Sequence, residues 1–191
     1  MASQPIPFAT PEEYLELEHE SAIKHEYLDG EIVAMAGTSF RHNLITRNLV
    51  RILVDQVRKT PCSEFGSDLR VAIPSHRLFC YPDMTIACPP FDLIPGMTDT
   101  LVNPTFLIEV LSRSTRAHDR GYKLPLYREI PSLAGYLFID QYKVSVEYGH
   151  RVSGNQWQVH LITDPNVVLD LVPIQCKVPI TSLYEDLDYD I

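Results

Sequence analysis

The chain lacks several features that define common protein classes. It has no long run of uncharged apolar residues, which excludes a membrane-spanning helix. Its first ten residues show no basic segment followed by an apolar one, so we expect no secretory signal and a cytoplasmic location. The patterns GxxxxGK[ST], GxGxxG and HExxH are missing, so no motif indicates a P-loop enzyme, a dinucleotide-binding enzyme or a zinc protease.

Cysteine is scarce. Cys62, Cys80, Cys88 and Cys176 form no CxxC pair and have no histidine at zinc-ligand spacing, which argues against a structural zinc site. In a reducing compartment we expect all four to be reduced and buried.

Positive charge is also limited, because the net charge is −9, and this argues against a general nucleic-acid coat. The charge is unevenly spread. Residues 1–40 carry one lysine against eight acids, residues 41–128 carry twelve bases against eight acids, and residues 129–191 carry three bases against nine acids. A basic middle between acidic ends predicts a local polyanion site, and the alternative is solvated helix faces. The aromatic residues are scattered along the chain and indicate no base-stacking platform.

Local patterns predict an α/β chain. Thr10-Pro11 begins a helix that runs to about Glu20, with Glu13 completing a capping box. A hairpin with its turn at Asp29-Gly30 is expected over residues 25–36.

The remaining pattern alternates helices with strands. Helical spacing predicts a helix over residues 41–59, and a further helix within 119–130 either starts near Pro125 or is kinked by it. No linker divides the chain, so we expect one domain over residues 1–191 with a mixed sheet flanked by helices. Strands are expected at residues 67–73, 79–87, 105–111, 135–140, 144–148, 157–162 and 167–171, with a loop at 89–103 and a short helix or tail at 181–191.

Asp83 and Glu109 stand out by their sequence surroundings. Asp83 follows Tyr81-Pro82 and precedes an apolar segment, and Glu109 lies in the almost wholly apolar run from 106 to 111. Such a run is typical of a strand covered on both faces, where a carboxylate is costly to bury unless it is paired or binds a metal. The alternative for Glu109 is a strand-end side chain that reaches solvent or meets an arginine.

Two carboxylates that converge from neighbouring strands would repel each other unless a divalent cation compensates. Oxygen ligands favour Mg²⁺ or Mn²⁺, and the backbone carbonyl of Val110 is a further candidate ligand. Lys123 is the candidate cation beside the attacked phosphate, and its alternative is an ordinary exposed helix lysine. His42 could bind phosphate or carry a proton, or be a polar surface residue at a helix start.

Three arginines follow Glu109 within one loop. Arg113, Arg116 and Arg120 would suit phosphate positioning and are the predicted substrate-binding residues. Asp119 could pair with one of them.

Several segments in their order resemble the Uma-type family of restriction-endonuclease-like proteins. The likeness extends from about residue 8 to about residue 190. It implies the PD-(D/E)XK nuclease superfamily fold and a metal-dependent phosphodiesterase site, in which Pro82-Asp83 matches the PD and Glu109 the second acid. The segments are EYLDGEIVAMAG, SDLRV, YPDM, NPTFLIEVLSRST, DRGYKLPLYREIPSL and GYLFIDQ.

The sequence departs from this pattern at one position. The pattern has a lysine two residues after the second acid, where Leu111 stands. In the family the lysine comes from the following helix, which implies Lys123. Glu31 matches a further acidic position and is a candidate third metal ligand or water-holding residue, and its alternative is an exposed hairpin glutamate.

Two classes of function follow. The first is a Mg²⁺- or Mn²⁺-dependent endonuclease that hydrolyses DNA phosphodiester bonds, acting as a homodimer because duplex cleavage needs two sites. The second is a weakly active or inactive nuclease-fold protein that serves as a nucleic-acid-binding or protein-interaction module, which the acidity and the missing lysine favour. RNA or branched DNA is an alternative substrate.

Overall fold

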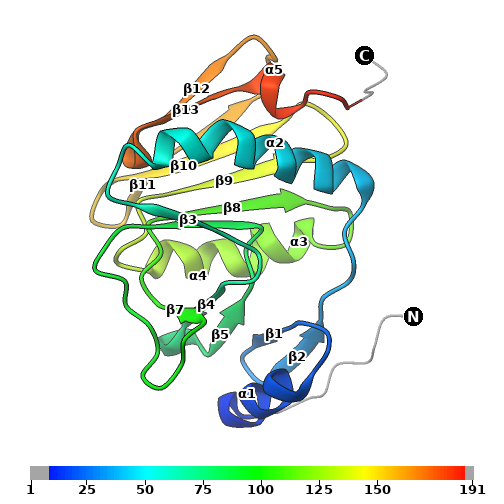
Figure 1. The fold of residues 1–191 in the computed structure, drawn as a ribbon, viewed down its shortest axis with the longest axis vertical. Helices are drawn as coiled ribbons and strands as arrows, with labels where there is room; N and C mark the ends of the chain where they lie inside the picture. The colour runs from blue at the N-terminus through cyan, green and yellow to red at the C-terminus, as the bar shows by residue number, and fades with distance from the viewer. Residues whose placement is uncertain (1–8, 188–191) are drawn as a thin grey trace.

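A six-stranded sheet lies at the centre of the computed structural model, which describes residues 9–187 (Figure 1). The strand order is β11-β10-β9-β8-β6-β3. Only β8 and β9 are parallel neighbours, so the expected mixed sheet is present. In the described range no helix is both long enough and apolar enough to cross a membrane. The strands are β3 (Ser63–Gly66), β6 (Met84–Ala87), β8 (Phe106–Leu111), β9 (Gly135–Asp140), β10 (Val146–Ser153) and β11 (Gln156–Ile162).

Helix α2 covers one face of this sheet (Figure 1). It spans Phe40–Val57 and begins after Ser39, whose hydroxyl accepts a hydrogen bond from the backbone N–H of His42. Its buried residues pack with Ile108 and Val110 of β8, so the helix expected over 41–59 is confirmed. A hairpin and two short helices complete this side: β12 (Val168–Leu171), η3 (Val172–Ile174), β13 (Cys176–Pro179) and α5 (Ile180–Leu183).

A helical segment with one wide turn covers the opposite face. It shows how Pro125 fits inside the predicted helix. Proline lacks an N–H and its ring clashes with the carbonyl four residues earlier in a regular α-helix. The turn just before Pro125 is π-helical, with the Leu124 N–H donating to the Asp119 carbonyl, and this spacing relieves the clash. The segment consists of α3 (Arg116–His118), the π-helix η2 (Asp119–Lys123) and α4 (Leu124–Glu129).

A second, five-stranded sheet lies beyond this helical segment, with the order β2-β1-β5-β4-β7 (Figure 1). The predicted capping box of its neighbouring helix α1 is present, because Thr10 and Glu13 exchange hydrogen bonds. The predicted hairpin is also present, with Asp29 and Gly30 at positive φ in its turn. The elements are α1 (Pro11–Glu20), β1 (His25–Leu28), β2 (Glu31–Ala34), β4 (Arg70–Ile73), η1 (Pro74–His76), β5 (Leu78–Cys80) and β7 (Thr100–Leu101).

The prediction of one strand over residues 79–87 was wrong. The chain forms β5 in the second sheet and β6 in the central sheet, and Pro82-Asp83 lie at the crossing between them. Because proline has no N–H to donate to a ladder, it interrupts strand pairing at this point. Asp83 consequently stands at the start of a strand, where its side chain can face a cavity.

Other differences concern short or weakly patterned segments. Strand β3 was not predicted, since its sequence SEFG lacks β-branched residues. The expected loop at 89–103 contains β7, and β10 is longer than the strand predicted at 144–148. Part of the stretch predicted at 181–191 forms α5, and residues 188–191 lie outside the described range.

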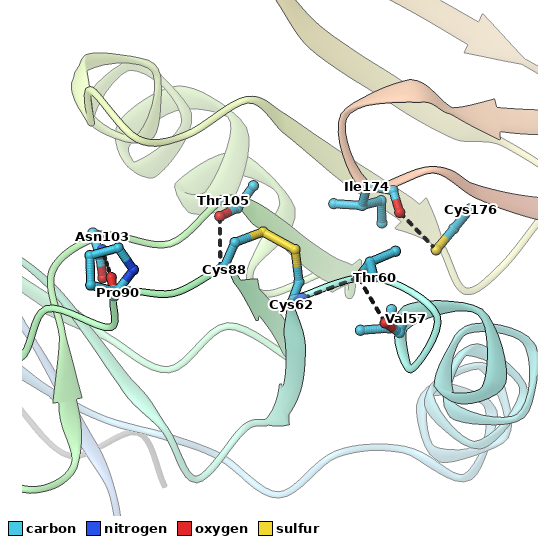
Figure 2. Close-up of a disulfide and its surroundings, with 9 residues drawn as sticks. All are labelled: Val57, Thr60, Cys62, Cys88, Pro90, Asn103, Thr105, Ile174 and Cys176. Atoms are coloured by element: carbon cyan, nitrogen blue, oxygen red, sulfur yellow. Dashed lines mark hydrogen bonds between the residues drawn. A yellow bond between two sulfur atoms is a disulfide. The ribbon is translucent and has the colours of Figure 1, made fainter.

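Two of the four cysteines form a disulfide (Figure 2). Cys62 precedes β3 and Cys88 follows β6, and these strands are antiparallel neighbours, which places the two Cα atoms 3.9 Å apart. The prediction of four reduced thiols was therefore wrong for this pair, because spacing along the sequence does not reveal strand register. Cys80 and Cys176 are free and buried, as expected.

Candidate active site

Asp83 and Glu109 meet on one side of the central sheet. Side chains alternate along a strand, so Glu109 points away from the core beneath α2, into which Val110 projects. Asp83 precedes Met84, which pairs with Ile108, and therefore lies beside Glu109. The Val110 N–H donates a hydrogen bond of 2.6 Å to Oδ2 of Asp83. Both acids line one cavity of about 560 Å³, so the structure brings the two predicted acids together.

Lys123 lies beside them as a buried cation. Its residue surface is only 4% exposed, which rules out the exposed helix lysine considered from sequence. Its Nζ lies 2.6 Å from Oε1 of Glu26, 3.1 Å from Oδ1 of Asp119 and 3.7 Å from Oε1 of Glu109. The helix residue therefore reaches the position at which the sequence argument required a positive charge.

These contacts determine the protonation of the site. Burial by itself lowers the pKa of Lys123, but Glu109, Glu26 and Asp119 raise it by more, so the pKa stands well above its usual value. The amine therefore remains a cation. Burial raises the pKa of Glu109 well above its usual value; Lys123 opposes this rise, whereas Asp119, Asp83 and Glu26 add to it.

Tyr127 positions Glu109 from α4. Its hydroxyl donates a hydrogen bond of 2.8 Å to Oε1 of Glu109 and lies 3.3 Å from the Cys80 thiol. The side chain is fully buried, and burial raises the pKa of its hydroxyl well above the usual value. Tyr127 therefore stays protonated and acts as a fixed donor that orients one carboxylate oxygen.

His42 also contacts the acids. Its Nε2 lies 3.1 Å from the Asp83 carboxylate, and the residue is only 7% exposed, unlike a surface histidine at a helix start. Its Nδ1 is buried without a partner in the part of the chain that the structure describes. Glu31 is exposed, as its hairpin alternative required, but it also lines the cavity.

Two of the three predicted phosphate-binding arginines are paired with acids, and the third lies over an aromatic ring. Arg116 forms an ion pair with the buried Asp140, and Arg120 lies 3.2 Å from Glu147. Arg113 is exposed and lies over the Tyr142 ring at 4.9 Å. None of the three is among the residues that line the cavity in the described chain.

Two site residues were missed or misassigned by sequence reasoning. Glu26 was not singled out, although alternation in β1 places it on the same face as the buried Leu28, which is a usable signal. Asp119 was expected to pair with an arginine, but it pairs with Lys123, four residues later along the helical segment. The two carboxylates hold the lysine amine in place.

The oxygen atoms of this cavity fit a small divalent cation. Oε2 of Glu109 has no hydrogen-bond donor among the described residues. The Val110 carbonyl points to the same side of β8 as its N–H, which faces Asp83. In the described range no group of three His, Cys, Asp or Glu side chains is arranged to hold a metal. Mg²⁺ usually binds one or two carboxylates and keeps several waters, and Asp83 and Glu109 would supply two.

The chain resembles known proteins over most of its length. A family model named Uma2, described as "Putative restriction endonuclease", matches residues 11–180. An uncharacterized protein of Synechocystis sp. is 35% identical over 157 residues, which cover 82% of each chain. A second uncharacterized Synechocystis protein is 33% identical over 161 residues, covering 84% of this chain and 91% of the relative.

A solved structure shares the fold. The crystal structure of a "putative nuclease belonging to DUF820" from Anabaena variabilis superposes with a TM-score of 0.75 at 17% identity, covering 92% of this chain and 97% of that one. It supports a mixed-sheet fold of the restriction-endonuclease-like type. With the family model matching most of the chain, the resemblance noted from sequence is confirmed, and the chain belongs to the Uma2 family of restriction-endonuclease-like proteins.

Proposed function

We propose that this protein is a divalent-metal-dependent endonuclease that hydrolyses phosphodiester bonds in DNA. The observation that carries the proposal is the shared cavity. Asp83 and Glu109 arrive from different strands, face one hollow open to solvent, and lie beside the buried ammonium of Lys123. The family's description as nuclease-like gives the class of chemistry.

Each residue has a distinct task. When bound by Asp83, Glu109 and the Val110 carbonyl, Mg²⁺ or Mn²⁺ would lower the pKa of a water and offset charge on the phosphate. The Val110 N–H and His42 hold Asp83, and the Tyr127 hydroxyl holds Glu109. Preorganised oxygens of this kind need little rearrangement during the reaction.

Lys123 would act as a cation and not as a base. Its three carboxylate neighbours keep the pKa high, so it does not give up its proton near neutral pH. It can donate a hydrogen bond to the attacking water or stabilise negative charge on the phosphate. Lys123 would thereby fill the role of the motif lysine, whose position in the sequence is occupied by Leu111.

Plasmid cleavage tests this proposal. Wild-type protein should nick or linearise plasmid with Mg²⁺ or Mn²⁺ but not with EDTA, and Asp83→Ala and Lys123→Ala should abolish cleavage. Asp92→Ala is the matched control, because Asp92 is an exposed acid in the 89–103 loop and outside the cavity. Plasmid, single-stranded DNA and RNA that stay equally intact with the wild-type and Asp83→Ala proteins, with every metal, would sink the nuclease assignment.

A binding or interaction module is the second candidate. The net charge of −9 and Leu111 in place of the motif lysine favour it. A domain without activity need not keep a cation site, so calorimetric titration with Mg²⁺ or Mn²⁺ separates the two candidates. Absence of a binding signal would favour the module.

We further propose that the chain is one domain, forms a homodimer and works in the cytoplasm. The Cys62–Cys88 disulfide is unusual for a reducing compartment. Thiol alkylation in freshly lysed cells would test the location and the bond together, and light scattering would measure the oligomeric state. A monomer in solution would count against the homodimer. A Cys62–Cys88 bond that stays oxidised in the cell would count against the cytoplasmic location.

A further inference from the structure

Exposed aromatic side chains gather around the cavity of Asp83 and Glu109. In the described chain four phenylalanine or tyrosine residues are exposed: Phe40, Phe91, Tyr122 and Tyr142. Phe40 and Tyr142 belong to the surroundings of this cavity, whereas Tyr122 lines a separate hollow with Asp29 and Arg77. Exposed apolar side chains that lie together mark an interaction site, whereas single ones are normal on a protein surface.

Their positions follow from the contacts. Phe40 is 78% exposed and directly follows Ser39, which lines the cavity and whose hydroxyl donates a hydrogen bond to the side chain of Gln141, the residue before Tyr142. Tyr142 is 38% exposed and itself lines the cavity. Tyr122 lies 5.4 Å from the parallel ring of His118, another lining residue. Phe91 instead contacts Phe65, away from the cavity.

Tyr142 is held in place. Its backbone N–H donates to Oδ1 of Asp140 at 2.9 Å, which fixes the turn after β9. The Arg113 guanidinium lies 4.9 Å from the ring centre. An exposed ring beside a guanidinium is the kind of surface on which unpaired bases stack.

The charge of the cavity points in the same direction. Its lining includes five acids but one lysine and no arginine. The nearby Arg116 and Arg120 are paired with Asp140 and Glu147. A duplex is gripped mainly through its phosphates by several lysine and arginine side chains. Among the three arginines that follow Glu109, only Arg113 is exposed without a carboxylate partner in the described chain, and it lies over the Tyr142 ring.

We propose that the substrate of this site is a nucleic-acid strand with unpaired bases. Phe40 and Tyr142 would stack successive bases at the cavity mouth while the phosphate between them enters toward Asp83 and Glu109. This inference rests on the proposed nuclease function and assigns its substrate class. Stacking on rings is tolerant of base identity, so no recognition sequence is required.

Binding measurements test the inference. Fluorescence anisotropy would compare a labelled single-stranded DNA, the same sequence as RNA, and the blunt duplex. The buffer would contain Ca²⁺, whose size and flexible coordination differ from the octahedral Mg²⁺ geometry, and gels would check that each oligonucleotide stays intact. We expect the single strand to bind about tenfold or more tightly than the duplex.

The aromatic variants give the sharper readout. Phe40→Ala and Tyr142→Ala should each weaken single-strand binding by about 5- to 100-fold and leave duplex binding unchanged. Phe91→Ala, an exposed ring outside the cavity, is the matched control and should bind like wild type. Preference for DNA or for RNA would each support the inference and would name the natural strand.

The outcomes separate this inference from the nuclease proposal. Single-strand binding that depends on Phe40 and Tyr142, without cleavage of any oligonucleotide, would keep the inference and remove the enzyme. Cleavage of duplex as fast as single strand, unaffected by Phe40→Ala and Tyr142→Ala, would keep the enzyme and overturn the inference. Equal losses in the Phe91→Ala control would also overturn it.

Discussion

Lys123 holds a buried positive charge that three carboxylates share. Its Nζ contacts Glu26 and Asp119 directly and lies within 3.7 Å of Glu109. Removing one member of a buried ionic group leaves the others uncompensated in a medium of low polarity. The arrangement therefore matters for folding as well as for chemistry.

Replacement of this lysine should destabilise the protein. We expect Lys123→Met to lower the free energy of unfolding by about 3 to 5 kcal/mol, because the neighbouring carboxylates lose their cation. Urea denaturation monitored by circular dichroism would measure the change. Lys143→Met, at an exposed lysine, is the control and should be nearly neutral. A loss below about 1 kcal/mol would show that the ionic cluster is not important for stability.

The raised pKa of Glu109 predicts a pH-dependent metal affinity. Burial, with Asp119, Asp83 and Glu26, raises this pKa well above 4.5 against the opposing effect of Lys123. Metal-free protein therefore keeps the Glu109 proton at pH values where an exposed glutamate has lost it. A cation must displace this proton, so affinity should rise with pH until the pH passes the raised pKa, with proton release on binding.

Calorimetry from about pH 5 to about pH 8, in buffers of different ionisation enthalpy, would count the released protons. Glu109→Gln should lose both the pH dependence and the proton release. An affinity for Mg²⁺ that stays constant over this range would contradict the assignment of Glu109 as a ligand.

At the scale of the elements, the Tyr136 ring of β9 lies against Gly149 of β10, in space that any other side chain would occupy. A Cβ added at Gly149 would lie 2.1 Å from the Tyr136 ring, which is fully buried between Phe138 and Trp157. The Tyr136 hydroxyl also donates to Glu147. The ring therefore cannot move aside without breaking several contacts.

Gly149→Ala should destabilise the protein by about 1 to 3 kcal/mol through overpacking. Thermal denaturation would detect this loss. Gly66→Ala is a matched strand control, since a Cβ there meets no atom within 4 Å. Equal melting temperatures for Gly149→Ala and the wild type would mean that Tyr136 repacks freely.

The disulfide links the neighbouring strands β3 and β6 through Cys62 and Cys88, which are 26 positions apart in the sequence. Cross-linking a loop of this size restricts the unfolded chain, so Cys62→Ser with Cys88→Ser should lower stability by about 3 kcal/mol. Urea denaturation of the oxidised protein and of the double variant would measure the difference. Cys176→Ala has no part in the bond, and its effect would report packing alone.

At the scale of the whole molecule, four arginines of the basic middle segment pair with acids of the C-terminal segment. Arg47 and Arg51 of the basic middle pair with Asp186 and Glu185 of the acidic end. Arg116 and Arg120 likewise meet acids from later strands. Of the three arginines that follow Glu109, Arg113 alone is left without an acidic partner among the described residues to contact a phosphate.

Nucleic-acid binding should accordingly depend weakly on salt. Each phosphate contact to a single strand contributes about −0.7 to the slope of log affinity against log salt. We expect a slope between 0 and about −2, measured by anisotropy from low to physiological salt. A slope steeper than about −4 would reveal a cationic surface that these ion pairs conceal.

Much of the architecture was readable from local pattern. The capping box at Thr10 and the Asp29-Gly30 turn predicted α1 and the first hairpin. The apolar run around Glu109 predicted a strand covered on both faces, and helical spacing predicted α2. These features depend on residues within a few positions of one another, where periodicity and turn chemistry act directly. Family resemblance added the pairing of Asp83 with Glu109.

The tertiary structure alone decided the rest. Glu26 and Lys123 are 97 positions apart, yet their side chains form one of the shortest ion pairs of the site. The crossing of the chain at Pro82, the strand register that joins Cys62 to Cys88, and the gathering of exposed rings at one cavity are likewise long-range. The sequence determines which groups would need a partner if they were buried, because charge and polarity depend on the residue type. Only the packed chain selects the partner, because that choice depends on distances between segments that no local pattern encodes.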